Sequence, residues 1–513
     1  MSAITLKPHE RELFGHPIGL YVLFFTEMWE RFSYYGMRSI LVIYMIAQAT
    51  NENGPGLAWT ELEAYQLYGW YVMLVYLISI PGGILADKVL GQKKTVMLGA
   101  ILLSIGHGVL AIETNWAFFT GLAFIIVGVG CLKPNISTMV GGLYKKGDIR
   151  RDKGFSIFYI GINLGSLLAT SFIGLVVAQW GWHAGFGLAG IAMIMGLLVY
   201  IYGQKYIVHV GNKPTEEQKK NDISIGKLFS KIFKAPTQLV VSLYIGYTKE
   251  GVDHWGYGAL FVFLSLVVGL MMMIYKDLDS KVMRDRFLVL LLSFLLVIVF
   301  WGAFEQAGGL MSVYTETKTD RVLFGMTIPT PMFQGLNAGF ILLLAVWIAN
   351  IWAKRKIKNK EASSLFKMAT GTIIMGLGFV FMIFAVREYE ANGSSHMIWL
   401  VLAYLFHTIG ELCSSPVSLS FVTKLAPVKY ASLMMGLYFA ATGLGGKVAG
   451  VIGEVSSQFG EYAIFSGIVI FTVIFGLLVI ALLKPLKRLT HGAEDNEGTN
   501  YEENEGFELA DNQ

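Results

Sequence analysis

Residues 24–38 read FFTEMWERFSYYGMR and lie inside an apolar run from Pro17 to Ala47. The run is long enough to cross a bilayer as one helix, although a charge at the bilayer centre costs about 3 kcal/mol on insertion scales. Because its polar residues recur at helical spacing, they form one stripe that predicts a helix lining a hydrated path. A self-neutralising structural network of salt bridges is the alternative. The stripe consists of Glu27, Glu30, Arg31, Tyr34, Tyr35 and Arg38.

The composition of the whole chain is that of a polytopic membrane protein. Of its 513 residues, 54% are hydrophobic and 15% are charged, whereas soluble domains carry about 25% charged residues. Two sets of six segments are long enough to span a membrane. The predicted spans are residues 17–47, 65–86, 95–112, 117–141, 155–178 and 185–203, then 287–313, 334–353, 367–387, 397–422, 430–455 and 462–483.

Basic residues gather in alternate loops, after the second, fourth and eighth spans, and this bias predicts that both termini are cytoplasmic. An insert at 207–286 then begins and ends on the same side, so it crosses the membrane an even number of times. Residues 256–275 resemble a span, and 228–247 is the candidate partner. We therefore expect a two-helix hairpin and fourteen transmembrane helices; an amphipathic surface insert with twelve spans is the alternative.

The two sets of spans also resemble each other. FFTEMWERF in the first span aligns with IVFWGAFEQ in the seventh, which places Glu30 on Glu305. Two parallel six-helix halves describe the all-α fold of the major facilitator type. The predicted domains are an N-terminal bundle (1–206), the insert (207–286), a C-terminal bundle (287–485) and a disordered acidic cytoplasmic tail (486–513).

Charges in other spans predict where the halves meet. Lys133 and Glu411 lie mid-span at equivalent positions of the fourth and tenth spans, so we expect them to face each other across a cavity and to belong to a gate. Glu305 is expected to pair with Arg38 and close an outer gate, which protonation of Glu305 would loosen. His407, one turn before Glu411, is interpreted as structural, with a proton relay as the alternative.

Cations, an anion, amides and aromatic side chains together suit a zwitterion of dipeptide size. The substrate carboxylate would meet the cations, its ammonium group would meet Glu411, and its side chains would rest on the aromatic residues. The predicted substrate-binding residues are Arg31, Tyr35, Tyr71, Lys133, Asn163, Trp301, Asn337, Glu411, Ser415 and Tyr438.

Three motifs resemble signatures of bacterial proton-coupled oligopeptide transporters of the major facilitator superfamily. They are EMWERFSYYG (27–36), FYIGINLGSL (158–167) and GGILADKVLGQKK (82–94). The resemblance implies symport of di- and tripeptides into the cell, by alternating access. It implies that Arg31, Tyr35 and Lys133 contact the peptide carboxylate, and that Asn163, Asn337 and Glu411 contact its amino terminus. The residues expected to couple protons are Glu27, Glu30, Arg31 and Glu305.

The chain departs from animal relatives of this family. Gly69 stands where they have a histidine, so coupling here is expected to depend on carboxylates. We expect no enzymatic activity, no cofactor other than protons as the coupling ion, and no nucleic-acid partner. The protein is expected to work as a multi-pass monomer in the bacterial cytoplasmic (inner) membrane. The alternatives are a transporter-derived peptide sensor or receptor, or a carrier of another small anion or metabolite.

Overall fold

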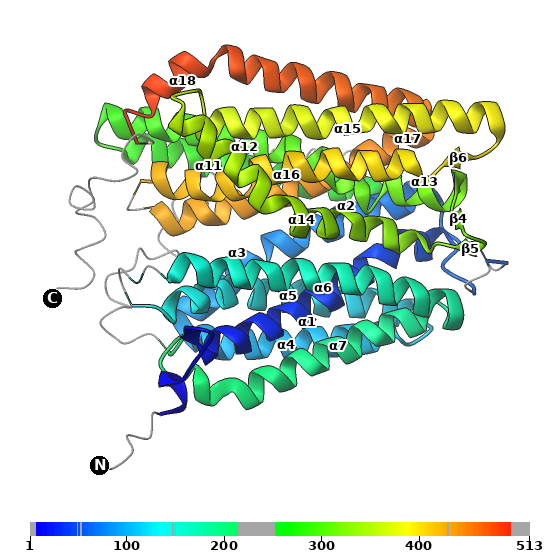
Figure 1. The fold of residues 1–513 in the computed structure, drawn as a ribbon, viewed down its shortest axis with the longest axis horizontal. Helices are drawn as coiled ribbons and strands as arrows, with labels where there is room; N and C mark the ends of the chain where they lie inside the picture. Colours follow the sequence, from blue (N-terminus) through cyan, green and yellow to red (C-terminus); the bar gives the residue numbers. More distant parts are fainter. Residues whose placement is uncertain are drawn as a thin grey trace.

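Helices make up most of the residues described in the computed structural model (Figure 1). Ten stretches of the described chain are long and apolar enough to cross a membrane. Helix α1, which carries the charged stripe, is a further helix of sufficient length. The predicted all-α polytopic fold is therefore confirmed. The structure describes residues 7–48, 50–51, 54–145, 148, 150–213, 252–427 and 430–493.

Most helices of the first half form the lower group in Figure 1, while α2 (Glu61–Leu77) lies against α17 (Ala431–Ala481) among the helices of the second half. The helix that follows Thr60 begins with a capping box. The Thr60 side chain accepts a hydrogen bond from the Glu63 amide, and the Glu63 carboxylate accepts one from the Thr60 amide. The elements are η1 (Pro8–Glu10), α1 (Ile18–Ile46), α2 (Glu61–Leu77), α3 (Ser79–Leu85), η2 (Ala86–Leu90), α4 (Gln92–Leu110), α5 (Asn115–Gly142), α6 (Arg151–Trp180), α7 (Trp182–Gly203) and η3 (Gln204–Tyr206).

The second half forms the upper group in the same view. Helix α11 covers the predicted span 256–275, while its expected partner, 228–247, lies outside the described residues. The count of fourteen spans therefore stays a prediction, as does a disordered tail beyond 493. The elements are α11 (Val252–Asp277), α12 (Lys281–Phe304), η4 (Glu305–Ala307), α13 (Leu310–Lys318), α14 (Thr330–Ile357), α15 (Ser364–Asn392), α16 (Ile398–Leu425), α17 (Ala431–Ala481) and α18 (Leu483–Leu489).

Two helices depart from the predicted spans. The seventh span, expected to be continuous over 287–313, is broken: α12 ends at Phe304, η4 follows, and two glycines precede α13. Helix α17 covers both of the last predicted spans. Its two arms meet at Gly460, whose φ of 77° favours glycine and marks the turn between them.

Short strands pair at both ends of the bundle. They are β1 (Glu12–Leu13) with β2 (His16–Pro17), β3 (Thr319–Asp320) with β6 (Ser395–His396), and β4 (Val322–Leu323) with β5 (Met326–Thr327).

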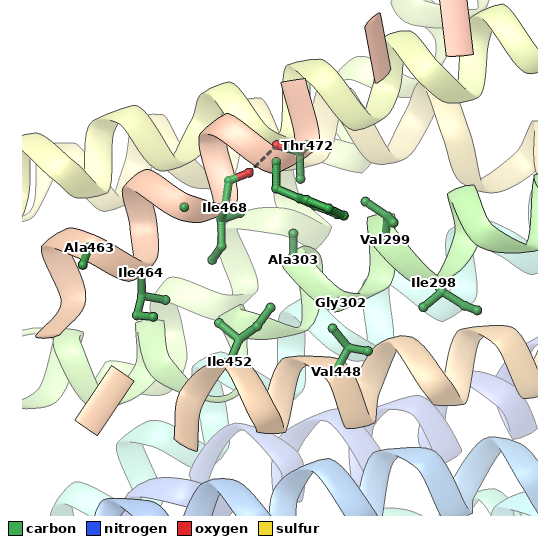
Figure 2. Close-up of a pocket in the computed structure, with 12 residues that line it drawn as sticks. Ile298, Val299, Gly302, Ala303, Val448, Ile452, Ala463, Ile464, Ile468 and Thr472 are labelled. Atoms are coloured by element: carbon green, nitrogen blue, oxygen red, sulfur yellow. Dashed lines mark hydrogen bonds between the residues drawn. The ribbon is translucent and has the colours of Figure 1, made fainter. Parts of the chain in front are cut away.

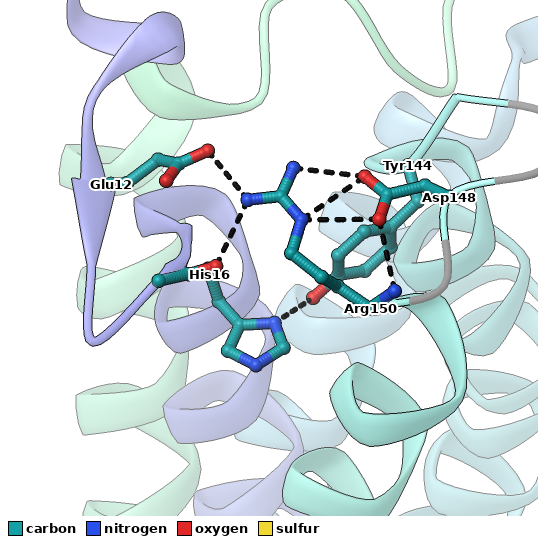
Figure 3. Close-up of polar contacts among 6 residues, drawn as sticks. Glu12, His16, Tyr144, Asp148 and Arg150 are labelled. Atoms are coloured by element: carbon teal, nitrogen blue, oxygen red, sulfur yellow. Dashed lines mark hydrogen bonds and ion pairs between the residues drawn. The ribbon is translucent and has the colours of Figure 1, made fainter.

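The β1–β2 hairpin is clamped to the loop between α5 and α6 (Figure 3). The Arg150 guanidinium donates to Glu12 at 2.8 Å and to the Gly15 carbonyl at 3.0 Å. The Tyr144 hydroxyl lies 2.8 Å from Nδ1 of His16. The start of the chain is thereby tied to the ends of two helices that reach the candidate site.

Glycines lie at close contacts between the two halves. A Cβ added to Gly69 of α2 would lie 3.0 Å from the Gly450 Cα of α17. Likewise, a Cβ on Gly335 of α14 would lie 2.4 Å from the Thr170 hydroxyl of α6. Small residues let helix backbones pack this closely, and these contacts set the spacing of the two halves.

Candidate functional site

The charged stripe of α1 is buried within the protein. Glu27, Glu30 and Arg31 expose 2%, 0% and 2% of their surface, respectively. The Arg31 guanidinium contacts both carboxylates: Nε lies 3.2 Å from Glu27, and Nη2 donates to Glu30 at 2.7 Å. The second Glu27 oxygen has no hydrogen-bond partner among the described residues. Two acids thus share one guanidinium, an arrangement that can take up a proton without leaving Arg31 unpaired.

Tyrosines surround this charge cluster. The Arg31 guanidinium lies 5.4 Å from the ring centroid of Tyr34 and 5.7 Å from that of Tyr35, within cation–π range. Tyr34 stacks on Tyr71 of α2 with centroids 6.4 Å apart. The buried hydroxyls of Tyr34 and Tyr71 have no hydrogen-bond partner in the described part of the chain, so both can donate to a bound anion.

A second charge group joins the two halves in the C-terminal half of α1. Arg38 lies 3.0 Å from Glu305 of η4, and both side chains are buried. This is the contact expected from the sequence. Tyr68 of α2 also donates to Glu305, at 2.9 Å, a contact that was not predicted. Tyr68 precedes Tyr71 by three residues and so shares its helix face, a signal that would have found it.

Neutral hydrogen bonds also join the two halves close to the Arg38–Glu305 pair. Nε2 of Gln334 on α14 donates to the Ser39 carbonyl of α1 at 3.2 Å and to the Ser312 hydroxyl of α13 at 2.8 Å. The break in the seventh span therefore contacts the first half through both charged and neutral groups.

Lys133 and Glu411 have separate partners instead of a shared ion pair. The Lys133 ammonium lies 4.1 Å from the ring centroid of Tyr76 on α2. Glu411 accepts a hydrogen bond from Asn337 at 2.8 Å, and the same amide nitrogen donates to Thr408 at 3.1 Å. No ion pair between Lys133 and Glu411 is found in the described residues, so their role in a gate stays a prediction.

The remaining predicted site residues lie on four helices. The Asn163 amide of α6 donates to the Tyr159 carbonyl at 3.0 Å. On α17, the Tyr438 hydroxyl lies 3.1 Å from Ser418 of α16. Trp301 and Ser415 are half-buried on α12 and α16. Asn163 and Tyr438 thus have their polar groups within their own half of the protein.

Comparison with known proteins identifies the family. The POT family profile, PTR2, matches residues 93–466. The chain belongs to the POT family. Peptide transporter YePEPT of Yersinia enterocolitica is 36% identical, over 96% of this chain and 99% of that protein. The di-/tripeptide transporter of Lactococcus lactis subsp. cremoris is 35% identical, over 94% of this chain and 99% of that protein.

The solved structures agree with this assignment. A crystal structure of a peptide transporter POT in complex with sulfate matches with a TM-score of 0.82 and 34% identity, over 94% of this chain and 97% of that one. POT family members are transporters, so the expectation of a non-enzymatic chain agrees with the family. The predicted major facilitator fold is confirmed, and the chain is a multi-span membrane protein.

Proposed function

We propose that this protein is a proton-coupled symporter that imports di- and tripeptides by alternating access. The observation that carries the proposal is Arg31 held between Glu27 and Glu30 in a buried site. When one carboxylate takes up a proton, the guanidinium is released from part of its pairing and meets the peptide carboxylate. Proton uptake and peptide binding are then linked through one side chain.

Substrate recognition is divided between the halves. Arg31, Tyr35 and Lys133 of the first half bind the peptide carboxylate, while Glu411, oriented by Asn337, and Asn163 bind its ammonium group. Tyr71, Trp301, Ser415 and Tyr438 line the space for the side chains. A zwitterion that contacts both halves favours the state in which they are closest. The peptide-transporting relatives support this substrate class.

The outer gate is the Arg38–Glu305 pair with Tyr68, and Lys133 and Glu411 close the inner side once a substrate bridges them. Protonation of Glu305 weakens its attraction to Arg38, so protons bias the gate toward opening outward. In this scheme both termini are cytoplasmic, the protein lies in the bacterial inner membrane as a monomer, and the six-helix bundles span 1–206 and 287–485.

Transport by purified protein in liposomes tests the proposal. With acid outside, dipeptide should accumulate inside, and dissipating the gradient should abolish accumulation. Glu113→Gln, at an exposed loop position, serves as a control that keeps full activity. Peptide binding without any flux would instead identify a sensor, and flux of small anions but of no peptide would identify a different carrier.

A further inference from the structure

An apolar groove opens between α12 and the two arms of α17, away from the charged site (Figure 2). Its volume is about 450 Å³. Ile298 and Gly302 form one wall, Ile452 forms the second, and Phe471 lies on the third. The Thr472 hydroxyl in the lining donates to the Ile468 carbonyl at 2.7 Å, so it does not require a polar ligand.

A second apolar depression adjoins the groove. This depression, of about 280 Å³, shares Ile298, Val448 and Ile452 with the first, and it reaches Leu260 and Leu264 of α11. A Cβ on Gly302 would lie 2.9 Å from Val448, so the glycine brings the two helices together at the floor. The apolar space is therefore long and shallow, and three elements form its walls.

The chemistry of this space selects its occupant. Val448 and Phe471 are 39% and 58% exposed, so the groove opens to the side of a membrane-spanning segment. Apolar cavities stay dry, and a cavity of about 150 Å³ holds one benzene; the first depression alone is about three times as large. We propose that the groove binds one acyl chain of a phospholipid from the surrounding bilayer.

The groove is adjacent to the segment that carries Glu305 of the proposed outer gate. Gly302 and Ala303 line it, and Glu305 of the gate follows them in the break between α12 and α13. An acyl chain packed against this wall braces the segment that carries Glu305. The effect on transport rests on the proposed function, whereas binding of the lipid does not.

A phospholipid with a photoactivatable acyl chain tests the binding directly. Full-length protein in vesicles of phosphatidylglycerol and phosphatidylethanolamine is irradiated, and labelled residues are mapped by mass spectrometry. Label should concentrate at 298–303 and 467–472, above the level at Leu343 and Val346, which are 75% and 73% exposed on α14. Those two residues report ordinary contact with boundary lipid.

Gly467→Leu fills the groove without a clash, because an added Cβ there meets nothing within 4 Å. Each displaced methylene should weaken binding about fourfold, so label at 298–303 should fall at least about fourfold. Gly108→Leu, at an equally open glycine on α4, is the matched control and should leave that label unchanged.

Three outcomes would overturn the proposal. Label at the groove equal to that on α14 would show ordinary boundary lipid only. Cross-links between two copies of the chain at this surface would make the groove an interface. Unchanged groove label in a folded Gly467→Leu protein, judged by its unfolding temperature and its label on α14, would show that no chain occupies the space.

Discussion

The two buried charge groups on α1 differ in what they connect. Glu27, Glu30 and Arg31 form a cluster on one helix, whereas Arg38 reaches Glu305 in the other half of the protein. In the proposed function the first group is the proton site, and it would change its protonation without movement of the halves. The Arg38–Glu305 pair would act as a latch, because it joins the two halves and breaks when they separate there. The residues of the two groups therefore have different expected phenotypes.

The distance between the groups is short. Arg31 and Arg38 are seven residues apart, about two helical turns and about 10 Å along the axis. Both contact the ring of Tyr35, at 5.7 Å and 5.3 Å from its centroid. Tyr35 thus provides a direct structural connection between the proton site and the latch.

The largest expected effect comes from breaking the latch. Arg38→Met leaves the buried Glu305 carboxylate without its cation, and removing one member of a buried pair destabilises by about 3–5 kcal/mol. The outward-open state should become dominant. Spin labels at Glu113 and Phe324, both on exposed outer loops, should move apart in distance measurements.

The double variant Arg38→Met with Glu305→Gln is the control, because it removes both charges. It should recover most of the closed population. Unchanged distances in Arg38→Met would mean that Tyr68 and Gln334 hold the outer end closed without the ion pair.

The next effect concerns the cluster within α1. Glu30→Gln keeps Arg31 paired with Glu27, so the fold and peptide exchange should survive. Gradient-driven accumulation should fall to the level without a gradient. One pH unit provides about 1.4 kcal/mol per proton, or tenfold accumulation, and this gain should be lost in the liposome assay. Equal loss of exchange and accumulation would assign Glu30 to binding or folding.

A smaller effect is expected where Asn337 orients Glu411. Asn337→Ala removes the 2.8 Å hydrogen bond to the carboxylate, and an unsatisfied buried acceptor costs about 1–3 kcal/mol. Calorimetry should show weaker binding of a free dipeptide. Thr408→Val removes only the other contact of the amide and should have less effect. If binding of an N-acetylated dipeptide falls equally, Glu411 does not recognise the ammonium group.

The smallest effect concerns the hairpin clamp. The Arg150 guanidinium and amide donate to Asp148 and hold the pKa of that carboxyl below its usual range. A lowered pKa stabilises the clamp above about pH 4, the ordinary value for Asp, and this contribution is lost as the pH falls through the lowered pKa. Protection factors for amide hydrogen exchange in residues 12–16, which correct for the intrinsic pH dependence of exchange, should therefore be constant from about pH 8 to 5 and fall only below about pH 4.

Arg150→Ala should lower these protection factors at every pH, while Arg11→Ala next to the hairpin should not. A fall in protection already at pH 6 in the unmodified protein would contradict the assignment to Asp148.

The sequence predicted what hydrophobicity and charge alone determine. The spans follow from long apolar runs, and the Arg38–Glu305 contact followed because a charge in hydrocarbon requires a partner and the internal repeat placed Glu305. Contacts of neutral groups between helices were not predicted. They are the hydrogen bond of Tyr68 to Glu305, the cation–π contact of Lys133 with Tyr76, and the hydrogen bond of Asn337 to Thr408. Helical periodicity gives the face of one helix and leaves its neighbour undetermined.

The break in the seventh span was also missed, for a related reason. The apolar run continues through the break, so hydrophobicity averaged over a window of residues indicates one continuous helix. Gly308 and Gly309 were the local signal of a break. The contact of Lys133 with Tyr76 depends on how α2 and α5 pack, and its lack of an ion pair with Glu411 among the described residues depends on how the two halves are placed. No local sequence pattern contains either.

The close packing of Gly69 against Gly450 restricts which side chains this position can accept. A Cβ added to Gly69 would lie 3.0 Å from the Gly450 Cα, so even alanine would press on the facing backbone. A histidine, which the family resemblance leads us to expect here in animal relatives, would push α2 and α17 apart where the two halves meet. Replacing Gly69 with a large residue would therefore require compensating changes in the opposite helix first.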